Sequence, residues 1–308
     1  MRPAAHIVIT DSGLGGLSIC AALEQGLRLA GPPRPVRLTY VNAWPFEGRG
    51  YNDLPDAAAR AGVFDAALTR MAQMQPDRIL IACNTLSILY PRTSFSLHPA
   101  VPVHGIVDAG VELFVKHLAS DPASSIVLLG TRTTIESGAH EERLERRGIG
   151  SRRIAALSCH GLAGAIERDV DGPRTAELIG ECAARAADAA PPGGTLLLGL
   201  CCTHYGYVAA RFIRAVARQT SRLVLALDPN RPLASSLLGD AGLFENTGDA
   251  VAAAVAPGAH AGGVVSVELV SKVALSETAR AGIARLVEPI SPATAGALLS
   301  YAHVPDLF

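Results

Sequence analysis

The sequence predicts an α/β fold built from two units with mainly parallel sheets. Short apolar runs rich in β-branched residues alternate with stretches of helical spacing along the chain. Several of these runs lack the in/out alternation of a half-exposed strand, which is typical of parallel strands covered by helices on both faces. The order of elements starts again near residue 101, and 308 residues are enough for two cores.

The first unit begins with a strand predicted at residues 5–10 (AHIVIT) and a helix predicted over 15–27. A second strand follows at 34–41 (RPVRLTYV). Phe64, Leu68 and Met71 then recur at i, i+4 and i+7, which places them on one face of a helix. The next strand is predicted at 77–82 (DRILIA), so this unit alternates strand and helix.

The second unit begins at 101–107 (VPVHGIV) and contains strands predicted at 124–130, 152–157 and 195–200. A helix is predicted through 137–147, between the first two of these strands. Further along, 208–219 has helical spacing, 222–227 is strand-like, and an alanine-rich region leads to a strand near residue 270.

Composition and charge exclude several classes of function. Lysine and arginine number 27 against 28 acids, so no general attraction to nucleic acid or to an anionic membrane is expected. The densest basic patch, EERLERRGIGSRR, alternates with acids and is typical of a solvated helix face. No signal peptide is visible, and the most apolar segment is interrupted by Pro257 and several glycines. We expect a cytoplasmic protein with reduced cysteines.

Small polar and nucleophilic residues gather at the ends of four predicted strands. In parallel sheets, ligands bind beyond the carboxyl ends of the strands, so these residues are expected to share a site. No CxxC pair or Cys/His cluster with the spacing of zinc ligands occurs, and no metal site is predicted. The strand-end residues are Asp11, Ser12, Cys83, Asn84, Thr85, Thr131, Thr134, Cys202, Thr203 and His204.

Cys83 and Cys202 stand out among the six cysteines. A lone cysteine is usually a small buried hydrophobe, and GLGG after a strand more often serves a tight turn than a phosphate. Both of these cysteines, however, are followed by polar residues where a helix would begin, and backbone N–H groups there favour a thiolate. Asp11 and His204 are candidates to orient the thiols and move their protons. Two bases on opposite sides of one carbon suit racemisation or epimerisation.

The motifs DSGLGGLS, ACNTLS, GTRTTIESGAH and CTHY resemble those of the glutamate racemases, in the cofactor-independent aspartate/glutamate racemase superfamily. Lesser similarities are VPVHGIVDAG, Asp228 after RLVLAL, FENTGDAVAAAV and VVSVELV. Together these cover residues 6–271 in the order of the family. The tail from about Ser271 lies outside the resemblance and is predicted to form one or two extra helices.

The resemblance implies two pseudo-symmetric α/β domains, with the active site in the cleft between them. The first domain would comprise residues 1–100 and 206–308, and the second 101–205. Cys83 and Cys202 would be the paired acid and base, with Asp11 assisting Cys83 and His204 assisting Cys202. The residues that would bind substrate are Ser12, Phe46, Glu47, Gly48, Asn84, Thr85, Thr131, Thr134 and Thr203.

The resemblance also implies the partners of such an enzyme. No cofactor, neither pyridoxal phosphate nor a metal, is expected. The binding partner would be a small-molecule amino acid, and glutamate is the commonest substrate of the family. The protein would form a homodimer. In bacteria the product, D-glutamate, feeds peptidoglycan synthesis and so cell wall biogenesis. Fixed donors in a water-poor cleft would stabilise the carbanion-like charge.

One stretch departs from the family pattern. Glutamate racemases carry Pro-Tyr-Gly after the second strand, and this chain has NAWPFEGRGYND, so Phe46 replaces the tyrosine and Glu47 the glycine, unless Gly48 shifts into its place. A carboxylate beside a dicarboxylate substrate would repel it. Alternatively, Glu47 points to solvent and leaves the site unchanged. The alternative functions are a racemase of another amino acid or specialised metabolite, and a catalytically silent binding or regulatory protein. Decarboxylases of the superfamily fit less well, because they keep one cysteine of the pair.

Overall fold

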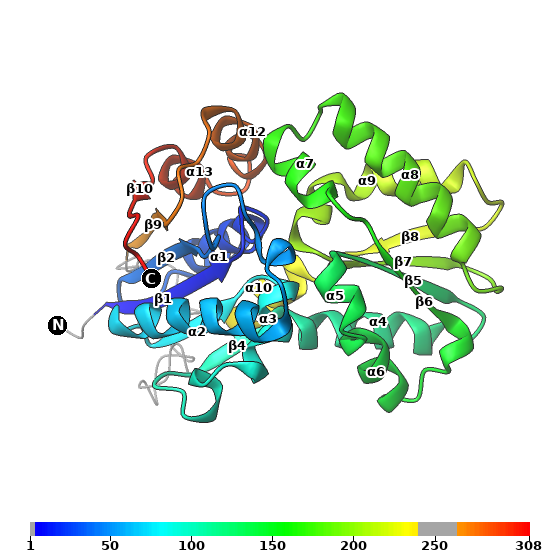
Figure 1. Cartoon of the computed structure of the whole chain (residues 1–308), viewed down its shortest axis with the longest axis horizontal. Coiled ribbons are helices and arrows are strands. Elements are labelled where there is room, and N and C mark those ends of the chain that lie inside the picture. The colour runs from blue at the N-terminus through cyan, green and yellow to red at the C-terminus, as the bar shows by residue number, and fades with distance from the viewer. Residues whose placement is uncertain (1–3, 240–263) are drawn as a thin grey trace, which may run out of the picture.

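The computed structural model describes residues 4–239 and 264–308 and contains two parallel sheets that lie side by side (Figure 1). The FENTGDAVAAAV motif lies outside the described residues. In spatial order, the first sheet contains β10 (Ala302–His303), β9 (Val265–Ser271), β2 (Val36–Asn42), β1 (Ala5–Asp11), β3 (Arg78–Ile81) and β4 (Val103–Gly105). The second contains β6 (Ile154–Ser158), β5 (Ser125–Gly130), β7 (Leu196–Cys201) and β8 (Val224–Leu227).

The two sheets repeat one topology, which confirms the predicted α/β fold with two pseudo-symmetric parts. The order β2-β1-β3-β4 in the first sheet corresponds to β6-β5-β7-β8 in the second, and every pairing is parallel. Parallel pairing places all carboxyl ends of a sheet at one edge. Asp11 pairs with Asn42 and Asn42 with Ser271, so these three residues end their strands in register.

Helices connect the strands and cover both sheets. Around the first sheet lie α1 (Leu17–Ala30), α2 (Ala57–Gln73), α3 (Asn84–Leu89), α10 (Asn230–Leu238), α12 (Glu277–Val287) and α13 (Pro292–Leu299). Around the second lie α4 (Ile106–Ser120), α5 (Arg132–Glu136), α6 (Ala139–Arg146), α7 (Leu162–Arg168), α8 (Pro173–Ala189) and α9 (Ala209–Ala217). Short 3-10 turns include η1 (Tyr51–Asp53), η2 (Tyr90–Arg92), η3 (Phe95–Leu97), η4 (Ser151–Arg153) and η5 (Thr203–Val208).

The apolar cores explain the strand patterns. In β1, Ile7 and Ile9 pack against the helices on one face of the sheet, while Val8 packs on the other face with Phe64 and Leu68 of α2. Strand β1 is therefore apolar on both faces, which is the reason for its missing alternation. Helix α8, which the sequence analysis did not predict, starts with Pro173 at its first turn, a position that proline favours.

Strand pairing divides the chain differently from the predicted domain boundaries. β8 pairs with β7 in the second sheet, although residues 206–308 were assigned to the first domain. β4 pairs with β3 in the first sheet, although it follows residue 101. A strand can join a parallel sheet only through a crossover, and α9 provides the one between β7 and β8. The chain thus leaves the first sheet at α4 and returns after β8.

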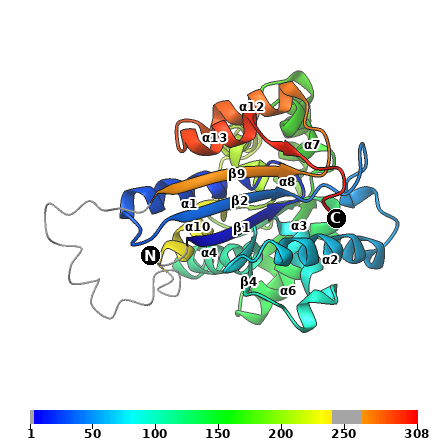
Figure 2. The same ribbon diagram turned by 90° about the vertical axis from the view of Figure 1, so that its left-hand side faces the viewer.

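The C-terminal residues form the two extra helices that were predicted, α12 and α13, and the short strand β10 at the edge of the first sheet. These helices lie above β9 and β2 (Figure 2). Helix α12 also contacts α7 of the second unit, where Arg285 pairs with Asp171 at 2.6 Å. Within residues 4–239 and 264–308, none of the helices has the length and hydropathy needed to cross a bilayer.

Candidate active site

A cavity of about 450 Å³ receives residues from the carboxyl edges of both sheets. It brings together most of the residues singled out in the sequence, which come from the loops after β1, β2, β3, β5 and β7. Those that line it are Asp11, Ser12, Glu47, Gly48, Cys83, Asn84, Thr85, Thr131, Cys202, Thr203 and His204.

The two thiols occupy equivalent positions in the repeated topology. Cys83 follows β3 and precedes α3 with φ −150° and ψ 125°, and Cys202 follows β7 and precedes η5 with φ −152° and ψ 128°. Both side chains are buried and both line the cavity. The pseudo-symmetry therefore presents one thiol from each sheet edge to the same space.

Cys83 lies beside neutral and acidic oxygen groups. Ser12 Oγ is 3.3 Å from Cys83 Sγ and 3.4 Å from Asp11 Oδ1. Burial raises the pKa of the Cys83 thiol well above its usual value, and the Asp11 carboxylate raises it further. This environment favours the protonated thiol.

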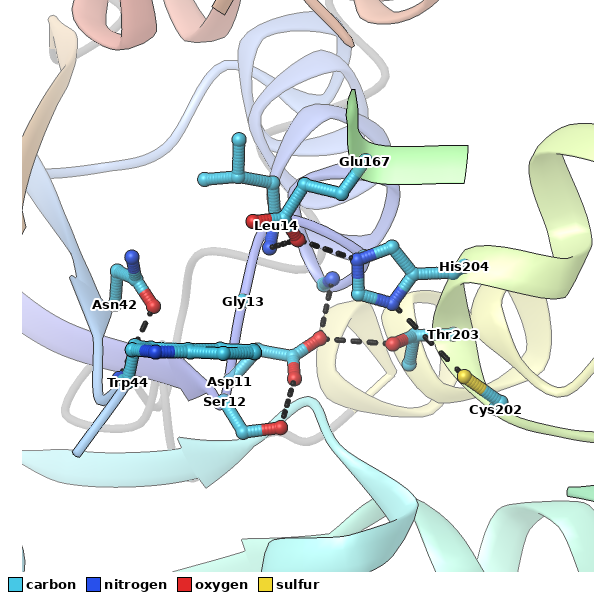
Figure 3. Close-up of polar contacts among 12 residues, drawn as sticks. Asp11, Ser12, Gly13, Leu14, Asn42, Trp44, Glu167, Cys202, Thr203 and His204 are labelled. Atoms are coloured by element: carbon cyan, nitrogen blue, oxygen red, sulfur yellow. Dashed lines mark hydrogen bonds and ion pairs between the residues drawn. The ribbon is translucent and has the colours of Figure 1, made fainter. Parts of the chain in front are cut away.

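Cys202 lies beside a charged relay. Its Sγ is 3.9 Å from Nδ1 of His204, whose Nε2 donates to Glu167 Oε2 at 2.7 Å (Figure 3). Burial alone would lower the pKa of His204, but its hydrogen bonds to Cys202 and Glu167 outweigh burial and raise the pKa well above its usual value. A protonated His204 stabilises a thiolate at Cys202.

Asp11 joins the two halves of the site. Its Oδ2 accepts hydrogen bonds from the hydroxyl of Thr203 at 2.8 Å and from the backbone N–H of Gly16 at 2.6 Å. Burial raises the pKa of Asp11, although His204 and hydrogen bonds from Cys83, Thr203 and Gly16 oppose the shift. A side chain expected to serve Cys83 alone is therefore also a contact between the first and second units.

The glycines of DSGLGG permit this close approach. A Cβ on Gly13 would lie 2.6 Å from Glu167 Oε2, and a Cβ on Gly15 would lie 2.4 Å from Thr203 Oγ1 and 2.7 Å from His204 N. Leu14, between them, donates its backbone N–H to Glu167 Oε2 at 2.9 Å. The loop thus packs directly on the turn of the second unit that carries Thr203 and His204, which gives its glycines a role other than phosphate binding.

A cluster of donors lies next to the thiols. Thr85 Oγ1 is 3.0 Å from Thr131 Oγ1 and 3.2 Å from Thr134 Oγ1, and the latter two hydroxyls are 3.0 Å apart. Thr134 stands behind the lining rather than in it. Asn84 Oδ1 is 3.1 Å from Nε2 of His140, while Asn84 Nδ2 is buried and has no hydrogen-bond partner among the described residues. Asn84 itself lines the cavity, so this nitrogen is a buried donor in the cavity wall.

The loop after β2 carries Phe46, Glu47 and Gly48, which were all expected to bind substrate, but only two of them line the cavity. Phe46 is 43% exposed and lies outside the lining, with the ammonium of Lys272 at 5.2 Å from its ring centroid. Glu47 lines the cavity, and its Oε1 accepts the backbone N–H of Ala274 at 2.7 Å. Gly48 has φ 71°, a left-handed conformation that favours glycine, so it provides the turn of the loop.

Sequence reasoning missed two partners and one wall of the site. Glu167 lies on α7 within the unremarkable segment GLAGAIERDV, and no motif marks it. His140 is the last residue of the motif GTRTTIESGAH, in which only Thr131 and Thr134 were assigned roles from the sequence. Residues 273–276, which precede α12, and Ala279 of α12 also line the cavity. Within the described parts of the chain, no group of three or more His, Cys, Asp or Glu residues is placed to hold a metal ion.

Comparisons with known proteins identify a matching family and several relatives. The family model described as Asp/Glu/Hydantoin racemase matches residues 8–230. The chain is 30% identical over 155 residues to the glutamate racemase of Campylobacter jejuni, an alignment that spans 46% of this chain and about half (52%) of that protein. It is 29% identical over 234 residues to the glutamate racemase of Granulibacter bethesdensis, covering 75% of this chain and 76% of the relative.

Solved structures share the fold. The crystal structure of glutamate racemase from Francisella tularensis in complex with D-glutamate superimposes with a TM-score of 0.64 at 19% identity, over 92% of this chain and 94% of that one. Glutamate racemase from Campylobacter jejuni superimposes with a TM-score of 0.63 at 21% identity, over 91% of this chain and 98% of that one. Both similarities extend across both sheets.

Proposed function

The chain belongs to the Asp/Glu/Hydantoin racemase family, and we propose that it is a cofactor-independent glutamate racemase that uses Cys83 and Cys202 as its two bases. The observation that carries the proposal is the pair of thiols at equivalent strand ends, lining one cavity with different polar partners. One base on each face of the α-carbon is the arrangement that inverts a stereocentre by proton transfer.

The two environments assign starting protonation states. Cys202, next to the protonated His204, is the thiolate that removes the α-proton. Cys83, in a buried site beside Asp11, is the thiol that delivers its proton to the opposite face. After one inversion, Cys202 holds the proton and Cys83 is the thiolate. The enzyme can then invert the opposite enantiomer directly, or the thiols return to the first state by exchange with solvent.

Charge on the α-carbon needs donors near the carboxylate of the substrate. The unpartnered amide of Asn84 and the hydroxyls of Thr85 and Thr131 line the cavity and are fixed before substrate binds. Donors that are fixed in advance stabilise developing charge without reorganisation. Asp11 and His204 assist Cys83 and Cys202, and Glu167 acts through His204.

Glutamate is the proposed substrate because the curated relatives are glutamate racemases. One observation favours a different amino acid on the same machinery, since the carboxylate of Glu47 lines the cavity. Its hydrogen bond with the Ala274 N–H satisfies one of its oxygens, which reduces the repulsion expected of a free carboxylate. A cytoplasmic location, a homodimer and a role in peptidoglycan synthesis stay predictions from the sequence.

The proposal is tested by proton NMR of L- and D-glutamate, and then of other amino acids, incubated with the protein in D₂O without added cofactor. We expect loss of the α-proton signal and formation of the opposite enantiomer. Exchange only with another amino acid would replace glutamate as the substrate. No exchange with any amino acid would leave the silent binding protein.

Variants of the two thiols test the mechanism. Cys83→Ala and Cys202→Ala should each abolish inversion, and each should retain α-proton exchange with one enantiomer, a different one in each variant. The matched control is Cys201→Ala, because Cys201 is buried beside Cys202 but does not line the cavity. Inversion at the rate of the unmodified protein in either of the first two variants would refute the two-base assignment.

A further inference from the structure

The first residues of the C-terminal extension form part of the cavity. Val273, Ala274, Leu275 and Ser276 line it together with Ala279, the third residue of α12. This wall carries four apolar side chains and one hydroxyl. It follows β9, whose last residue, Ser271, ends in register with Asn42 at the catalytic edge of the first sheet.

Backbone hydrogen bonds hold this wall at the cavity. Ala274 donates its N–H to Glu47 Oε1 at 2.7 Å, and Leu275 donates its N–H to the hydroxyl of Tyr301 at 2.8 Å. Ser271 Oγ accepts from Asn42 Nδ2 at 3.1 Å and donates to the carbonyl of Val273 at 2.7 Å. The hydrogen bond between the Ala274 N–H and Glu47 connects the wall to the loop after β2.

A charged contact holds the same two segments together. The Lys272 ammonium lies 5.2 Å from the ring centroid of Phe46 and 4.3 Å from that of Phe308. A cation over the face of an aromatic ring is attracted by the negative charge of that face. The aromatic ring at position 46 therefore supports the extension, although the sequence had placed it among the substrate-binding residues.

The extension also reaches the second unit. Helix α12 packs on α7, where Arg285 and Asp171 form an ion pair, and Leu286 packs against the cores of both units. Helix α7 carries Glu167, the partner of His204. A segment that touches both units is placed to fix the width of the cavity between them.

We propose that the wall formed by residues 273–276 and Ala279, which Glu47 fastens, selects substrates by limiting the length of the amino-acid side chain that the cavity accepts. The inference rests on the proposed function, because it names the length selectivity of the same site. The wall presents apolar side chains and no cation, so it bounds the side chain of the substrate by shape and not by pairing with its charge. Cutting back one of its side chains should admit a longer substrate.

The fastening is tested by hydrogen exchange, which does not depend on activity. Glu47→Ala removes the acceptor of the Ala274 N–H, whereas Glu47→Gln keeps an oxygen there and removes only the charge. We expect the amides of residues 272–276 to exchange about fivefold faster in Glu47→Ala and at the original rate in Glu47→Gln. Equal exchange in both variants and the unmodified protein would overturn the fastening role.

The selectivity is tested by comparing glutamate with 2-aminoadipate, its homologue with one more methylene. Leu275→Ala should raise kcat/KM for 2-aminoadipate relative to glutamate by about tenfold, the discrimination typical of one methylene. The matched control is Leu299→Ala, because Leu299 belongs to the same extension, is exposed, and lies outside the lining. An unchanged ratio in Leu275→Ala would overturn the proposed selection.

The outcomes separate the two proposals. If the unmodified protein racemises another amino acid, the same comparison is made with that substrate and its longer homologue. If it racemises none, the proposed function fails, and the hydrogen exchange of Glu47→Ala against Glu47→Gln still decides whether Glu47 fastens the wall.

Discussion

Replacement of Glu167 by glutamine tests the relay behind Cys202. The carboxylate of Glu167 accepts from His204 Nε2 at 2.7 Å and from the Leu14 N–H at 2.9 Å, and the His204 side chain is 7% exposed. Glu167→Gln keeps an oxygen that can accept both hydrogen bonds and removes only the negative charge. The variant therefore measures what the charge contributes to the protonated His204.

The expected loss follows from the burial of this pair. Hydrogen bonds to a charged partner contribute about 1.5–3 kcal/mol, against about 1 kcal/mol for neutral pairs. A difference of about 2 kcal/mol lowers kcat/KM about 30-fold. Because Glu167 raises the pKa of His204, the limb of the pH–kcat/KM profile that reports this histidine should move to lower pH.

The assay is initial-rate racemisation from each enantiomer across pH. Racemisation has an equilibrium constant of 1, so the loss in kcat/KM must be equal from both enantiomers. If Glu167 acts only through His204, the double variant Glu167→Gln/His204→Asn should lose no more than His204→Asn alone. The matched control is Glu177→Gln, an exposed acid of α8 paired with Arg174. Full activity with an unmoved pH profile in Glu167→Gln would refute the relay.

Three further predictions concern packing, pH and amide orientation. Gly15→Ala should reduce kcat/KM more than 100-fold, because its Cβ would lie 2.4–2.7 Å from atoms of Thr203 and His204. The control is Gly62→Ala, on α2 with open space around it, which should keep full activity and stabilise the helix by about 1 kcal/mol. Burial raises the pKa of Asp228 to about 6, so the folded state binds more protons than the unfolded state between about pH 4 and 6 and stability falls as pH rises through that range. Asp228→Asn should therefore raise the free energy of unfolding by about 3 kcal/mol at pH 7.5 but not at pH 4, as measured by urea unfolding. An equal change at both pH values would refute the assignment. His140→Phe keeps an aromatic ring but removes the Nε2 that contacts Asn84 Oδ1. We expect KM to rise about fivefold while the melting profile at pH 7.5 stays native. An unchanged KM would contradict a positioning role for His140.

The sequence was sufficient to predict much of the fold because its signals are local. The apolar runs at 5–10 and 77–82 form β1 and β3, and the doubly buried pattern of β1 reports a sheet covered on both faces. The meeting of Asp11 and Cys83 was also predictable, since parallel strands bring their carboxyl ends to one edge of a sheet. The approach of Cys202 from the second sheet was expected only from the family resemblance. The assignment of β8 was less accessible, because pairing with β7 depends on the path of the chain after α9.

The parts of the site that escaped prediction depend on contacts between distant segments. Glu167 meets His204 across 37 positions only because α7 packs beside η5, and its surrounding sequence has the composition of an ordinary helix. Cys159, at the end of β6, also lines the cavity, but nothing in its local sequence separates it from a core cysteine. Side chains on helices that cross between the units therefore need the tertiary structure before a role can be assigned.

Glu47 shows how a local departure from a motif can have a distant explanation. The sequence offered two interpretations of this residue, a carboxylate that repels a dicarboxylate substrate and a side chain that points to solvent. In the structure Glu47 is exposed, lines the cavity and accepts from the Ala274 N–H, which lies 227 positions away in the sequence. Phe46 contacts Lys272 of the same segment. Phe46 and Glu47 thus both contact one C-terminal segment, which is the pattern expected if the loop and that segment changed together.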